Sequence, residues 1–437
     1  MGLSLGESTF VGKWICGGTS PSSPPWPDLP LEIAGHVLSR LASHDDRLSF
    51  GTVCHDWRLA AQHHRPLPPP AMPCINLGDG EYRSLADYGK VRRFVTPRHG
   101  RDVVSSYGNW LLQERDLYRP CLLRDPFVRA PSAIEVPCHY DPCTGHRFDV
   151  VGSSRDPPRT SRNIDKLRKI VVVQSQHLLV AKFNGRLFRT APANFACFRP
   201  GARPLSWSHA TGATSGHQHH GCRDFTYKDI AFHRGKIFAV GWMEDLFAHE
   251  FVGGDQSLLQ SRVEHVIKNP PYASVCITAN HHLVTSSNNQ KLFIVRWYIT
   301  PKAVNIIHEH AMNLHVFEAD LDKGQWLEVK DLGDQILFVG ESGSRAFATA
   351  CSLEHYGDRR FRGGNRVFLL GKDWAQAWST ATFNSTACLC SHCQNLKDGI
   401  PSYCVYDMVS GKTSLVSLTR GHNPKDASRS QWFFPSG

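Results

Sequence analysis

The chain has 437 residues, 41% of them apolar, so it can fill a sizeable core and is not an intrinsically disordered protein. Lys and Arg outnumber Asp and Glu by 49 to 39, a surplus compatible with an anionic partner. The basic residues form only loose groups, so we do not expect nucleic acid to be that partner. No stretch reaches the ~18 apolar residues of a membrane span, and residues 1–20 lack a signal-peptide pattern. We therefore expect no membrane association, reduced cysteines and a location in the nucleus, the cytoplasm or both.

Short helices are predicted near the N-terminus, after a leader rich in Gly, Ser and Pro. In "WPDLPLEIAGHVLSRL" (26–41), Pro30 takes the position that proline favours at a helix start, and apolar residues recur at helical spacing. "SHDD" (43–46) supplies capping residues for a second helix, and Trp57 lies on or just after a third helical turn. "HHRPLPPPAMP" (63–73) ends the helical segment.

From about residue 74 the chain consists of short apolar runs bounded by turn residues, which is typical of strands and hairpins. Five residue pairs have the composition of hairpin turns: Asn184-Gly185, Arg234-Gly235, Asn288-Asn289, Lys323-Gly324 and Ser410-Gly411. Successive hairpins favour a β-propeller, although a pair of packed β-sandwiches stays open as an alternative. The fold class is mainly β, with a propeller-like domain behind a small all-α module. We predict a leader (1–25), a helical module (26–65), a Pro-rich linker (66–73), the β-domain (74–420) and a tail (421–437).

Short sequences that resemble catalytic motifs fail on spacing. "SGKTS" (410–414) lacks the first glycine of a phosphate-binding loop, "GESGS" (340–344) is not a nucleophile elbow, and "HEH" (308–310) is not a metalloprotease pair. The chain thus gives no positive argument for an enzyme or a cofactor. Four residues within "CLCSHC" could hold zinc, but their spacing is unusual for a zinc site and we predict no metal there: Cys388, Cys390, His392 and Cys393.

The helical module needs a surface to pack on, because about 40 residues cannot bury an adequate core alone. One possibility is that it packs on the β-domain that follows. The Pro-rich linker argues against this, since it separates the two parts as a semi-rigid spacer would. We therefore expect an apolar face of the module to be available to another chain.

Residues 26–61 resemble an F-box. The residues that stand at that family's spacing are Leu29, Pro30, Ile33, Val37, Leu38, Leu41, Val53, Cys54 and Trp57. The resemblance implies that these residues include the face that binds a Skp-type adaptor, while a few only hold the helices together. Gly51 departs from a good helix former, at a cost of ~1 kcal/mol.

Most of residues 74–420 resemble the β-rich domain that follows F-boxes in a large plant family, the KIB-type β-propeller or domain of unknown function 295. The segments that carry the resemblance include "YKDIAFHRGKIFAVGW" (227–242) and "WLEVKDLGDQILFVG" (326–340). The resemblance implies a non-catalytic substrate receptor of a cullin-RING ubiquitin ligase, which contacts a cullin through the adaptor and presents an unknown target protein. The alternative is a binding or scaffold protein whose F-box no longer recruits a ligase.

Overall fold

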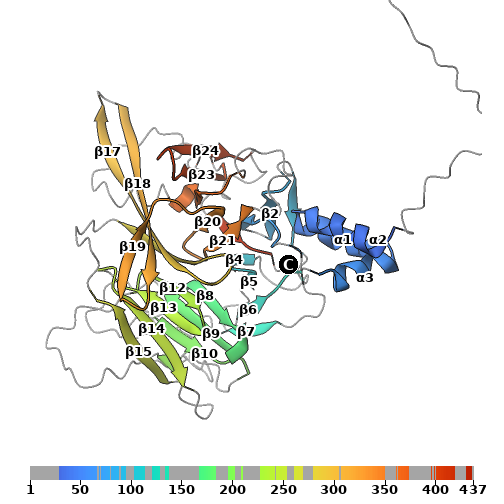
Figure 1. Cartoon of the computed structure of the whole chain (residues 1–437), viewed down its shortest axis with the longest axis horizontal. Coiled ribbons are helices and arrows are strands. Elements are labelled where there is room, and N and C mark those ends of the chain that lie inside the picture. Colours follow the sequence, from blue (N-terminus) through green and yellow to red (C-terminus); the bar gives the residue numbers. More distant parts are fainter. Residues whose placement is uncertain are drawn as a thin grey trace, which may run out of the picture.

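The computed structural model describes residues 29–65, 68–94, 103–113, 121–127, 133–136, 167–183, 195–201, 208–209, 227–252, 260–268, 279–349, 361–373, 395–398, 400–418 and 430–435, apart from 69, 79, 88–89, 242, 305–306, 362 and 396–397. The predicted leader, the Asn184-Gly185 turn and the cysteine-rich segment 388–393 lie outside these residues. Three helices stand at one side of a large β-domain (Figure 1). Within the described residues, no helix has the length and hydropathy of a membrane span.

The N-terminal module consists of α1 (Leu31–Arg40), α2 (His44–Val53) and α3 (His55–His63). The predicted cap of the second helix is confirmed, because Ser43 Oγ accepts a hydrogen bond from the Asp46 N–H at 3.4 Å. The module has a small core of its own, in which the Phe50 and Trp57 rings stack at 4.6 Å. Four buried side chains form its centre: Ala34, Leu38, Phe50 and Ala60.

The β-domain consists of six sheets, and each sheet is one blade of a propeller. Blade 1 contains β25 (Gln431–Phe433), β1 (Cys74–Gly78), β2 (Glu81–Ser84) and β3 (Val91–Arg93), and blade 2 contains β4 (Val103–Tyr107), β5 (Trp110–Gln113), β6 (Cys121–Arg124) and β7 (Ile134–Val136). Blade 3 contains β8 (Leu167–Val173), β9 (Leu178–Phe183), β10 (Phe195–Phe198) and β11 (Ser208–His209), and blade 4 contains β12 (Asp229–His233), β13 (Lys236–Val240), β14 (Leu246–Val252) and β15 (Gln260–Ile267). Blade 5 contains β16 (Asn280–Thr285), β17 (Leu292–Val304), β18 (Ile307–Asp320) and β19 (Gln325–Val329), and blade 6 contains β21 (Arg345–Ala348), β20 (Gln335–Val339), β22 (Arg366–Leu370), β23 (Ser402–Asp407) and β24 (Thr413–Ser417).

Local turn chemistry forms the hairpins at the predicted places. Arg234 and Gly235 connect β12 to β13 with φ values of 46° and 83°, the left-handed conformation that a two-residue hairpin turn requires. Gly324 and Gly411 also have positive φ, at 63° and 65°, in the turns before β19 and β24. The described hairpin predictions are therefore confirmed.

The C-terminal strand β25 closes the ring of blades. The prediction that residues 421–437 form a tail outside the β-domain is therefore wrong for Gln431–Phe433. β25 pairs with β1, so that Gln431 lies opposite Asn76. On its other side, Ser106 Oγ in blade 2 donates to the Trp432 carbonyl at 2.9 Å. The β-domain therefore extends past residue 420, because the first blade is built from both ends of the domain.

Blade 6 departs from a regular meander. Its strands β20 and β22 run parallel, and β21 pairs with the other side of β20. Blade 5 is also unusual, because β17 and β18 pair from Phe293–Glu318 to Val304–Ile307 and project beyond β16 and β19 (Figure 1). These departures account for the irregular spacing of the hairpin turns along the sequence.

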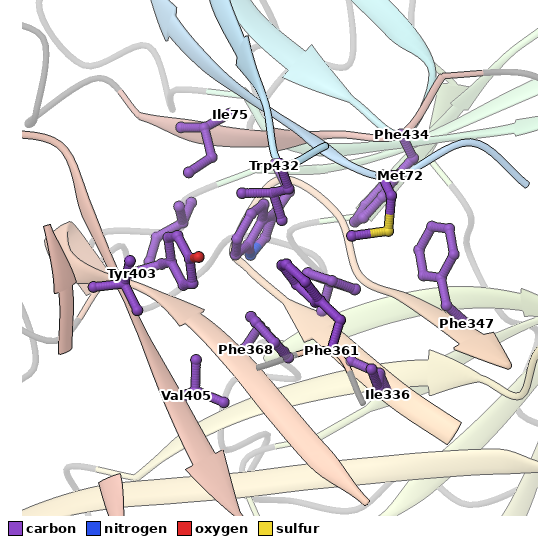
Figure 2. Packing of buried hydrophobic residues seen from close by; sticks show 14 of the residues in the cluster. Met72, Ile75, Ile336, Phe347, Phe361, Phe368, Tyr403, Val405, Trp432 and Phe434 are labelled. Atoms are coloured by element: carbon purple, nitrogen blue, oxygen red, sulfur yellow. The ribbon is translucent and has the colours of Figure 1, made fainter. Parts of the chain in front are cut away.

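Hydrophobic clusters fill the spaces between neighbouring blades. The cluster between blades 6 and 1 surrounds the fully buried Trp432 indole (Figure 2). The centres of the Trp432 and Phe338 rings lie 5.2 Å apart. Met72, from the predicted linker, and Phe434, which follows β25, belong to the same cluster (Figure 2). The core thus joins segments from the start and the end of the propeller.

The helical module is attached directly to the propeller. Tyr82 Oη donates a 2.7 Å hydrogen bond to Asp45 Oδ1, and Arg92 Nη1 lies 2.9 Å from Asp45 Oδ2. The His44 ring lies 4.0 Å from the Phe127 ring, and the Met72 N–H donates to the Ala42 carbonyl at 2.8 Å. The prediction that residues 66–73 hold the two parts apart as a spacer is therefore wrong at the C-terminal end of the linker.

Candidate functional site

Four of the nine F-box positions are exposed on the helical module. Ile33, Val37 and Val53 have 49%, 37% and 53% of their surface exposed, and Pro30 is exposed as well. Ile33 and Val37 are four residues apart in α1 and therefore lie one turn apart on the same face. This face is available to another chain.

The other five positions are occupied within the module. Leu38 is 3% exposed and belongs to its core, so it is one of the positions that hold the helices together. Leu29, Leu41 and Trp57 are half-buried against the same core. Cys54 Sγ accepts a hydrogen bond from the Trp57 N–H at 3.4 Å and so caps α3.

Sequence reasoning missed two exposed apolar residues, Leu31 (47%) and Leu48 (44%). Both lie in predicted helices, so they could have been found by listing every apolar residue of these helices that does not face the core of the module. Of the nine exposed large hydrophobic side chains in the described chain, five belong to the helical module: Leu31, Ile33, Val37, Leu48 and Val53. Apolar exposure is thus concentrated on the smaller of the two parts, which is typical of an interaction surface.

The attachment leaves this surface free because it uses other side chains. Asp45 accepts from both Tyr82 and Arg92, and Arg92 also pairs with Asp87 at 2.9 Å. Burial and the bond to Asp45 raise the pKa of Tyr82, which keeps its hydroxyl protonated as a donor. Burial also lowers the pKa of His44, so a neutral imidazole faces Phe127.

A second candidate site is a cavity of about 770 Å³ in the central channel of the propeller. Its wall is built from β8, β12, β16 and β21 together with the turn between β4 and β5. Short polar side chains occupy its rim: Asn109, Ser175, Ser287, Asn288 and Asn289. Pro70 also lines the cavity, two residues before the point where Met72 bonds to the helical module.

The wall of the cavity contains two charged side chains, Lys169 and Arg345. Lys169 Nζ is held by both carboxylate oxygens of Asp229, at 2.8 and 2.9 Å. Asp229 also accepts the Leu283 N–H at 2.7 Å, so this buried pair is a satisfied structural element. Arg345 has no such partner among the described residues.

The cysteine of blade 6 that follows the "CLCSHC" segment is a core residue. Cys404 is fully buried in β23, and burial, with a further contribution from Asp373, raises the pKa of its thiol to about 12. Such a thiol is a poor metal ligand. The four weak zinc candidates, Cys388, Cys390, His392 and Cys393, lie outside the described residues.

Comparison with protein families identifies both parts of the chain. A family model described as "KIB1-4 beta-propeller" matches residues 82–407, and an F-box-like model matches residues 26–67. The chain belongs to the KIB1-4 β-propeller family. Its F-box-like region coincides with the helical module, and the KIB1-4 propeller has six blades. This pairing fits a substrate-receptor F-box protein and is typical of non-catalytic adaptor or receptor proteins.

Among solved structures, the Myceliophteria thermophila Cps50 (Swd1) propeller domain has 12% identity to the KIB1-4 chain and a TM-score of 0.27, covering 59% of this chain and 85% of that one. The N-terminal domain of Nup159 has 7% identity and a TM-score of 0.25, covering 76% and 62%. A putative 6-phosphogluconolactonase from Bacteroides fragilis has 12% identity and a TM-score of 0.25, covering 77% and 72%. We draw no functional argument from scores this low. No curated protein matches the chain.

Proposed function

We propose that this protein is a substrate-receptor subunit of a cullin-RING ubiquitin ligase. Its F-box-like module binds a Skp-type adaptor and, through it, a cullin, while the propeller recruits a target protein. It works in the nucleus, the cytoplasm or both. The protein itself carries out no chemistry in this role.

The observation that supports the proposal most directly is that the helical module uses different side chains for its attachment to the propeller and for its exposed apolar face. One set of side chains, centred on Asp45, fixes the module to the propeller. A different set, which includes Ile33 and Val37, stays exposed and apolar. A module that served only to cover the propeller would have no reason to expose this second set to water.

The test is the affinity of the full chain for a Skp-type adaptor, measured by biolayer interferometry. Ile33 and Val37 are 49% and 37% exposed, so docking would bury the remaining part of each side chain. This part contributes about 1 kcal/mol per residue, so the Ile33→Ala, Val37→Ala double variant should bind roughly 30-fold more weakly. Alanine is a good helix former, so α1 should stay intact.

The matched control is Val409→Ala, which removes an 81% exposed aliphatic side chain from the propeller and should leave adaptor affinity unchanged. Equal binding by the double variant would show that α1 is not the docking face. If the unmutated chain does not bind the adaptor, the alternative applies: a scaffold protein whose F-box no longer recruits a ligase.

A further inference from the structure

Arg345 is a half-buried cation that has no counter-ion among the described residues. It lies on β21 and is one of the residues that line the channel cavity. Its guanidinium carbon lies 5.4 Å from the centre of the Phe347 ring, and the guanidinium makes no hydrogen bond or ion pair with another described residue. Burial lowers its pKa. No guanidinium nitrogen of Arg345 is both buried and without a partner, so its unused N–H donors remain accessible and can donate to a ligand in the cavity.

The rest of the cavity wall does not neutralise this charge. The described lining contains Lys169 as its other charged residue and no Asp or Glu. Asp229 lies behind the wall, where both of its oxygens are already used by Lys169 and one also accepts the Leu283 N–H. The described lining therefore offers Arg345 no carboxylate as a counter-ion.

Further cationic side chains lie near Lys169 of the cavity wall. Burial lowers the pKa of Lys182, and it lowers the pKa of Lys228 to about 8. The charges of Asp229, Glu341, Lys169 and Arg168 also affect the pKa of Lys182. Arg168 pairs with Glu341 at 3.2 Å. Five cationic side chains thus lie in or near the cavity wall together with three carboxylates, those of Asp229, Glu341 and Asp373. None of these carboxylates belongs to the described lining, so the lining itself favours an anion.

The rim is suited to a peptide. Asn109, Ser175 and Ser287 offer uncharged donors and acceptors that can bond to a backbone, and Trp110 adds a half-buried aromatic surface. The cavity volume of about 770 Å³ is that of a ligand site rather than of a packing defect. Because Pro70 joins the cavity wall to the segment that bonds to the helical module, a segment bound here would lie beside that module.

We propose that the channel cavity binds an oxyanion, a carboxylate or a phosphoryl group, carried by an extended segment of the target protein, and that Arg345 is its anchor. The planar guanidinium donates two parallel hydrogen bonds to such a group. This inference rests on the proposed receptor function, because it specifies what the receptor recognises.

The test uses the full chain and three fluorescent peptide pools that differ only in a fixed central residue: glutamate, phosphoserine or glutamine. We expect the glutamate or the phosphoserine pool to bind at least about tenfold more tightly than the glutamine pool in fluorescence anisotropy. The pool that binds more tightly than the glutamine pool identifies the preferred oxyanion. Arg345→Gln should reduce this preference to less than about twofold, and Arg345→Lys should retain only part of it.

Arg234→Gln is the matched control, because Arg234 is an exposed arginine outside the cavity lining and should leave the preference intact. Ser287→Trp is a second variant in case Arg345→Gln does not fold. It obstructs the rim but keeps the arginine, and it should weaken binding of the preferred pool by a similar factor.

The proposal is overturned if the three pools bind alike or if the preference persists in both Arg345→Gln and Ser287→Trp. It is also overturned if inorganic phosphate alone binds in an Arg345-dependent manner while the peptides do not, since the site would then take a free anion. Adaptor affinity is measured on the same samples. If the adaptor binds normally but the pools show no preference, only this inference fails, whereas loss of adaptor binding in the unmutated chain counts against the receptor function.

Discussion

The closure of the propeller by β25 leads to a quantitative prediction for Trp432→Ala. The indole is fully buried, lies 5.2 Å from the Phe338 ring, and donates a 2.9 Å hydrogen bond from Nε1 to the Val339 carbonyl. Replacing a buried Trp by Ala costs about 3–5 kcal/mol in transfer and cavity energy. Loss of the hydrogen bond adds about 1 kcal/mol. Trp432→Phe keeps most of the ring contacts and should cost only about 1–2 kcal/mol.

Urea unfolding of the full chain, followed by circular dichroism, measures these differences. Removal of residues 430–437 should be at least as damaging as Trp432→Ala, because β1 and β4 lose their shared neighbour. Removal of residues 436–437 leaves β25 whole and serves as the control. A loss of less than about 1 kcal/mol for Trp432→Ala, or unaltered unfolding after removal of 430–437, would refute the closure argument.

Three further predictions concern pH, Gly51 and the module attachment. Burial lowers the pKa of His282 from 6.5 to about 4, so the unfolded state binds the proton first and stability falls as the pH drops from 6.5 to 4. Between pH 7 and pH 4 the free energy of unfolding of the parent should fall by about 3 kcal/mol more than that of His282→Gln. Urea unfolding curves that shift equally with pH in both proteins would contradict this. At Gly51 an added Cβ meets no atom within 4 Å, so Gly51→Ala should raise stability by up to ~1 kcal/mol, and a lower melting temperature would contradict it. Tyr82→Phe removes the 2.7 Å bond to Asp45 and should speed amide exchange in α2 but not in β22, and equal exchange in parent and variant would count against the attachment.

Features set by a few neighbouring residues could be predicted from the sequence. The Ser43 cap and the Arg234-Gly235 turn depend on the conformational preferences of the residues that form them, and both occur where they were expected. The change from helical periodicity to short apolar runs likewise located the boundary between module and propeller to within a few residues. Such features need no knowledge of distant parts of the chain.

Features that depend on distant pairing could not be predicted in the same way. β25 has three residues and no pattern of its own, and its partner strand β1 lies at the opposite end of the domain. The parallel pair of β20 and β22 leaves no turn signal, because β21 intervenes between them in the chain. Arg345 is one of many basic residues in the sequence. The lack of a counter-ion among the described residues follows only from the way five of the six blades bring their strands together around the cavity.

The corrected role of the linker changes what the architecture can do. A spacer between an adaptor-binding module and a propeller would let a bound target sample many orientations. Here Asp45 bonds to two propeller side chains, and Met72 joins the module to the core between blades 6 and 1. Under the receptor function proposed above, the target must be held within reach of a second enzyme, so a fixed angle between the module and the channel would restrict which target lysines are accessible. Selectivity would then depend on this attachment as well as on the residues that contact the target.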